Sequence, residues 1–163
     1  MRKQQKGFSL IELLIVVAII LIIAAIAIPN LLRARMAANE ASAVASVRTV
    51  NTGMITYASN YPTVGYAGTL AVLGGATPCT PTSTTACLID NVLATGTKSG
   101  YRFSATGAGG PPAGTYYAVG TPMTLNQTGT RSFCAFEDAV VRVQPTGANI
   151  ASEAACQALT PLQ

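Results

Sequence analysis

An apolar run of 21 residues, Phe8–Ile28, is the feature that most constrains this chain, and it carries a single carboxylate, Glu12. A helix rises about 1.5 Å per residue, so the run reaches roughly 32 Å and matches the hydrocarbon thickness of a bilayer. An unpaired acid inside such a segment costs on the order of 3 kcal/mol. We therefore expect the run to span a membrane, and Glu12 to require either solvent or a partner of opposite charge.

Two explanations account for Glu12. Near the N-terminal end of a helix the macrodipole favours a negative charge by roughly 0.3–1 kcal/mol, with water within reach. Alternatively, another chain supplies a cation, since two unit charges about 4 Å apart attract by roughly 4 kcal/mol at an effective dielectric of 20. The second effect is large enough to offset the cost of the buried acid, so we favour it.

The sequence KGFSLIEL at residues 6–13, followed by the apolar run and Pro29, resembles the N-terminal motif of type IV pilins and pseudopilins over residues 1 to about 61. The resemblance implies that a membrane peptidase cleaves between Gly7 and Phe8 and methylates the new amino group of Phe8. It also implies that Glu12 attracts the terminal amine of a neighbouring subunit during filament assembly. That amine is the cation that Glu12 requires.

Two alternatives remain for the same segment. The basic residues Arg2, Lys3 and Lys6, the apolar stretch and the triplet 25–27, an A-x-A pattern, also fit an ordinary secretory signal whose mature chain begins at Ile28. The run is longer than the usual 7 to 15 residues of such signals, and it contains a carboxylate. An uncleaved single-span anchor is the other alternative, and all three interpretations place the N-terminus in the cytoplasm.

Composition argues against several classes of function. The chain of 163 residues has ten basic and six acidic residues, but removing Arg2, Lys3 and Lys6 leaves seven against six. The remaining cations are dispersed, so we expect no nucleic acid as the main partner. There is no histidine, no phosphate-binding G-x-x-x-x-G-K-[ST] motif and no G-x-S-x-G motif, so we expect neither catalysis nor a cofactor.

Four cysteines in an exported chain indicate disulfides, and three pairings are open. We expect the sequential one, Cys79 with Cys87 and Cys134 with Cys156. A zinc site made of all four thiolates is the alternative, but the C-x2-C spacing that such sites prefer is missing, so we expect no metal. The acidic pair at 137–138 offers too few oxygen ligands for calcium and fits a turn between strands.

The helix is expected to continue from Phe8 to about Ser59 and to stop at Tyr61-Pro62, because the residue before a proline disfavours the helical region. Its second half is amphipathic. Pro29 lies inside this helix, lacks the N–H that would bond to Ala25, and predicts a kink or local melting. The expected apolar stripe is Val47, Val50, Met54, Ala58 and Tyr61, with Arg48, Asn51, Thr52 and Ser59 mostly on other faces.

An α+β fold follows, with a long N-terminal helix, half transmembrane and half amphipathic, packed on a small antiparallel sheet. Residues 61–92 are rich in Gly, Pro and Thr and predict mainly loop. A short helix is expected near 151–159. Strands are expected at 100–106, 115–120, 131–136 and 139–143, with Tyr101, Phe103, Tyr117 and Val141 buried against the helix.

The resemblance implies a leader at 1–7, a helix at 8–61 whose residues 8–28 cross the membrane or form the fibre core, and a globular head at 62–163. The expected function is a structural subunit that polymerises into a type IV pilus-like filament. Alternatives are a pseudopilin of type II secretion, or a minor pilin that acts as an adhesin or DNA receptor. The implied partners are copies of the same chain, the peptidase and methyltransferase, inner-membrane assembly machinery and, before assembly, membrane lipid. The implied location is the bacterial inner membrane, then the cell surface.

Overall fold

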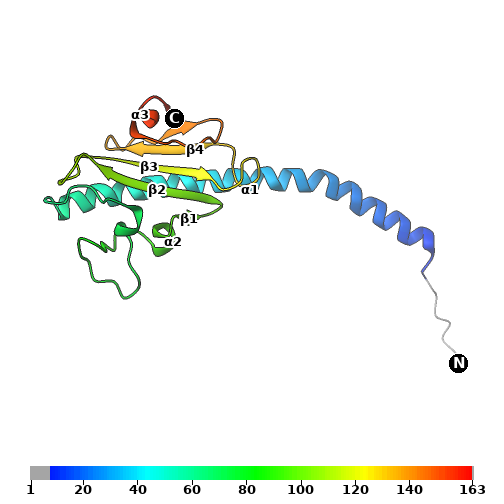
Figure 1. Cartoon of the computed structure of the whole chain (residues 1–163). Helices are drawn as coiled ribbons and strands as arrows, with labels where there is room; N and C mark the ends of the chain where they lie inside the picture. Colours follow the sequence, from blue (N-terminus) through cyan, green and yellow to red (C-terminus); the bar gives the residue numbers. More distant parts are fainter. Residues whose placement is uncertain (1–7, 163) are drawn as a thin grey trace. The chain divides into compact units, whose positions relative to one another are not determined.

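A computed structural model describes residues 8–162 of the chain. Two compact units divide the chain, Met1–Arg35 and Met36–Gln163. Helix α1, Leu10–Asn60, contributes to both, and all remaining elements belong to the second unit. Figure 1 shows the strands of that unit lying along the later part of α1.

Helix α1 forms where the sequence predicts it, with bounds one or two residues from those expected. The alanines of its second half favour helix, and Tyr61-Pro62 follows its last residue. Helical residues continue without interruption through Pro29, so local melting at this proline is not observed in the single chain. One proline removes one backbone hydrogen bond at a cost of about 3 kcal/mol, which the turns on either side tolerate.

The head contains a six-stranded antiparallel sheet whose strands pair in chain order. Most of the pairing is made by the three central strands. The elements are the 3₁₀ helix η1 Leu70–Leu73, α2 Asn91–Ala94, β1 Thr97–Lys98, β2 Tyr101–Ala108, β3 Thr115–Pro122, β4 Ser132–Phe136, β5 Arg142–Gln144, α3 Glu153–Gln157 and β6 Thr160–Pro161.

The prediction for the last strands was wrong in detail. Residues 139–141 are not a strand, and β5 begins only at Arg142. Ala139 has a positive φ of 59°, which interrupts extended backbone directly after the turn at 137–138. The short edge strands β1 and β6 were not predicted, since two residues are too few to show alternation. The short C-terminal helix was expected, and α3 falls within its range.

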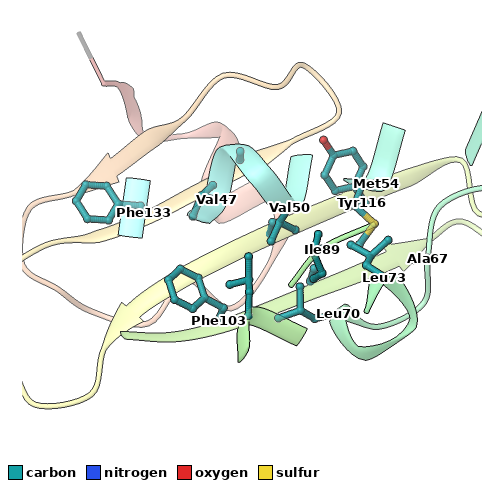
Figure 2. Close-up of a cluster of buried hydrophobic side chains, with 14 of the residues drawn as sticks. Val47, Val50, Met54, Ala67, Leu70, Leu73, Ile89, Phe103, Tyr116 and Phe133 are labelled. Carbon is teal, nitrogen blue, oxygen red and sulfur yellow. The ribbon is translucent and has the colours of Figure 1, made fainter. Parts of the chain in front are cut away.

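The core lies between the second half of α1 and one face of the sheet, as Figure 2 shows. On the helix, Val47, Val50, Met54 and Tyr57 are almost fully buried. Ala58 and Tyr61, which we expected on the same stripe, are only half-buried. The sheet contributes alternate residues of its strands to this face: Tyr101, Phe103 and Ala105 from β2, Tyr116 and Ala118 from β3, and Phe133 and Ala135 from β4.

The burial of Tyr117 was predicted incorrectly, because its neighbour Tyr116 points to the helix instead. Successive side chains of a strand lie on opposite faces, and Tyr116 is fully buried while Tyr117 is half-buried on the other face. A second apolar cluster on that outer face contains Val119, Cys134, Phe136, Ile150 and Cys156. The disulfide Cys134–Cys156, with Cα atoms 6.0 Å apart, joins β4 to α3 there.

Residues 61–92 are mainly loop, as predicted, apart from the short helix η1 and the first residues of α2. The second disulfide, Cys79–Cys87, closes a short loop with Cα atoms 6.1 Å apart. The chain on either side packs into the main core through Leu73 and Ile89. Both side chains lie against Gly53 of α1, where a Cβ atom would come within 3.1 Å of Ile89 Cγ2. A glycine inside the helix therefore permits this close packing.

Glu40 fixes the start of the head-bound part of α1. Its Oε1 accepts hydrogen bonds from the Thr130 N–H and hydroxyl, both at 2.8 Å, and its Oε2 lies 2.7 Å from Arg131 Nη2. Burial raises the pKa of Glu40, but the hydrogen bonds from Thr130 and Arg131 and the charge of Arg131 outweigh it, so the pKa lies below its ordinary value. The ionised carboxylate thus anchors the β3–β4 connection to the helix.

Met54→Ala is expected to lower the free energy of unfolding of the head by about 2–5 kcal/mol, because it leaves a cavity in a fully buried site. The matched control is Ile55→Ala, since Ile55 is 43% exposed and surface changes usually stay within about 0.5 kcal/mol. Denaturant unfolding of the full chain in detergent, followed by circular dichroism, measures both. Equal effects would contradict the burial pattern of α1.

Glu40→Gln is expected to cost roughly 1–3 kcal/mol, because hydrogen bonds to a charged group are lost. Since the folded pKa lies below the ordinary value of 4.5, the carboxylate stabilises the head above that pH. The stabilisation is lost as the pH falls through the folded pKa. Unfolding measured between pH 7 and pH 2 should show a shallower pH dependence for this variant. Glu153→Gln is the control, and a wild-type slope in Glu40→Gln would exclude the proposed origin.

Candidate functional site: the N-terminal segment of α1

The described part of the first unit is almost entirely helix, and its large apolar side chains are exposed. Phe8 is 84% exposed, and the segment long and apolar enough to cross a membrane has none of its residues buried. A shallow apolar groove runs along one side of it, lined by Leu10, Leu13, Leu14, Val17, Ala18 and Leu21. Such a surface needs cover, because burying one large aliphatic side chain is worth about 1.5–3 kcal/mol.

Glu12 lies in the first turn of this helix and caps it. Ser9 precedes the first helical residue, and its N–H donates to Glu12 Oε2 at 2.9 Å. This is the N3-to-N-cap half of a capping box, in which the third helical residue bonds back to the residue before the helix. The carboxylate is exposed and has no ion-pair partner within residues 8–162.

The other predicted site residues lie at two places. Phe8 precedes the cap, one residue before Ser9, whereas Gly7 and the rest of the expected leader fall outside the described residues. Pro29 lies within α1, 17 positions after Glu12, and its side chain is exposed. The structure therefore brings Phe8 and Glu12 to one helix end and leaves Pro29 about 26 Å away along the helix.

The acidic pair at 137–138 forms a turn, as expected, and serves the head. Asp138 pairs with Arg142 at 2.7 Å and accepts a hydrogen bond from the Val140 N–H. Burial raises the pKa of Asp138, but these contacts with Arg142 and Val140 leave it below its ordinary value. No cluster of three or more His, Cys, Asp or Glu side chains that could hold a metal occurs in the described part of the chain.

Sequence reasoning missed two polar contacts that matter here. The capping box was visible as Ser9-x-x-Glu12, a signal of helix N-termini, but it was not considered beside the pairing role of Glu12. Asn51 was expected to lie away from the apolar stripe, yet it is buried and 3.4 Å from both the Tyr116 hydroxyl and the Ala139 carbonyl. Its partners lie more than 60 positions away, so no local pattern reveals them.

Comparison with known proteins agrees with this geometry. The family described as "Prokaryotic N-terminal methylation motif" matches residues 2–28. Over 38 residues the chain is 66% identical to the type IV wide pilus major component PilA4 of Thermus thermophilus. That match covers 23% of this chain and 29% of the relative. No solved structure matches the chain.

The family match includes the segment in which the structure places Ser9, Glu12 and the exposed apolar helix. The relative is a pilus component by its own description. The fold behind the segment is α+β, with the helix packed on an antiparallel sheet. The N-terminal segment of the chain thus carries a prokaryotic N-terminal methylation motif and is similar to the matching segment of a type IV pilus component.

Proposed function

We propose that this chain is a structural subunit that polymerises into a type IV pilus-like extracellular filament through the first part of α1. The observation that carries the proposal is an exposed apolar helix whose first turn holds one carboxylate with no ion-pair partner among residues 8–162. A membrane covers this surface before assembly, and the corresponding helices of other subunits cover it afterwards. The apolar side chains thus remain out of water in both states.

The apolar contacts alone do not select the filament over the membrane, because lipid tails are as apolar as the side chains of a neighbouring helix. A polar interaction must supply the difference. Cleavage between Gly7 and Phe8 creates an amine at the same helix end as Glu12. In the filament, the methylated amine of Phe8 on one subunit pairs with Glu12 of the next and so sets the axial register.

Cleavage and methylation require a prepilin peptidase and methyltransferase, and extraction from the inner membrane requires assembly machinery. Pro29 is the position at which α1 loses helicity if it adjusts on packing, because the carbonyl of Ala25 already lacks its N–H partner. The head needs no catalytic group for this role. Its exposed surface faces other heads and the medium.

Glu12→Gln separates the two roles of this residue. Glutamine also serves at N3 of a capping box, so the helix cap is kept while the charge is lost. We expect processing to continue and the yield of sheared filaments to fall at least about tenfold, which corresponds to about 1.4 kcal/mol of a pairing energy of roughly 4 kcal/mol. N-terminal mass spectrometry establishes whether Phe8 is methylated, and electron microscopy counts the filaments.

Ser9→Ala is the matched control, because it removes the N-cap side chain and leaves the charge of Glu12 in place. Filament yield should stay near wild type in this variant. Normal filaments from Glu12→Gln would refute the charge pairing. A mature N-terminus at Ile28, or a retained leader, would refute the filament proposal itself.

A further inference from the structure

Two arginines follow the apolar part of α1. Arg33 and Arg35 are both exposed, and neither forms an ion pair with any residue between 8 and 162. Within the described part of the first unit the sole acid is Glu12, 21 positions before Arg33. That separation corresponds to roughly 32 Å of helix. Both guanidinium groups are therefore open to an anion from outside this unit.

Their depth places them at a membrane surface when the helix spans a bilayer. From Leu10 to Arg33 the helix rises by roughly 35 Å, whereas the hydrocarbon core is about 30 Å thick and the bilayer with its headgroups about 40–45 Å. Leu31 and Leu32, both exposed, extend the apolar surface up to Arg33. The two arginines thus begin where the hydrocarbon ends, at the depth of the phosphate groups.

The directions of the two side chains favour a partner that surrounds the helix. Each residue turns the helix by about 100°, so positions 33 and 35 point about 200° apart. One neighbouring protein helix covers a single side and would meet only one of them. Lipid headgroups encircle the helix and meet both. The guanidinium group also fits phosphate well, because its parallel N–H donors bind two oxygens at once.

We infer that Arg33 and Arg35 bind the phosphate groups of the leaflet at the C-terminal end of the span and so fix the depth of the unassembled subunit. The inference rests on the proposed function for the membrane-held state, but it concerns a contact that assembly must release rather than one that assembly makes. Charged residues then lie at both ends of the span, with Glu12 near one interface and the two arginines at the other.

The test uses the full chain, with ¹³C in its arginine guanidinium carbons, reconstituted in vesicles of phosphatidylcholine and phosphatidylglycerol. Solid-state NMR measures dephasing of these carbons by lipid ³¹P, and a carboxylate from a second copy gives none because proteins without phosphorylation contain no phosphorus. We expect dephased arginine signal in the wild type. The Arg33→Gln/Arg35→Gln double variant should lose the part of this signal that these two residues give, while Arg2, in the basic flank at the opposite interface, keeps its own.

Arg48→Gln is the matched control, since Arg48 is exposed on α1 and lacks an ion pair within the described residues, but belongs to the second unit. It should keep the dephased signal. Absence of dephasing in the wild type, or an equal signal in the double variant, overturns the inference. If filaments still form in that case, the proposed function stands without it. If the chain does not float with the vesicles, the membrane-held state fails as well.

Discussion

The structure depends on one constraint: residues 13–28 of α1 are apolar on every side of the helix, and none of this apolar segment is buried. The second part of the same helix is covered, because the sheet and the segment after Tyr61 bury one face of it. A single helix thus joins a folded head to a surface that is stable only in lipid or among other copies. The proposed polymerisation follows from that difference more directly than from any property of the head.

Within the head, one ion pair and one glycine control how the helix is held. Glu40 anchors the β3–β4 connection near the first helical turns of the unit, and Gly53 admits Ile89 and Leu73 farther along. The two disulfides lie elsewhere, one in the loop between helix and sheet and one on the outer face. The helix is therefore held by packing and hydrogen bonds, while the covalent links secure the regions with least regular structure.

The sequence predicted the features with strong local signals. The length of the apolar run, the stop at Tyr61-Pro62, the central strands and the pairing of cysteines close in sequence all agree with the structure. It failed where the outcome depends on distant residues. Tyr116 and Tyr117 are adjacent tyrosines, and only the register of β3 in the sheet decides which one faces the helix. The burial of Asn51 depends in the same way on partners far away in the chain.

The capping box reduces what the charge on Glu12 gains from the proposed pairing in a filament. In the single subunit the carboxylate is not left without a partner, since it accepts the Ser9 N–H, and a hydrogen bond to a charged group contributes about 1.5–3 kcal/mol. Pairing with an amine is worth roughly 4 kcal/mol, so the gain on assembly is the difference, about 1–2.5 kcal/mol for each subunit. Such a gain is too small to hold two subunits together alone, yet it is repeated at every subunit of a filament. In the proposed filament this gain therefore selects the register, while the apolar contacts provide the surface on which that register is set.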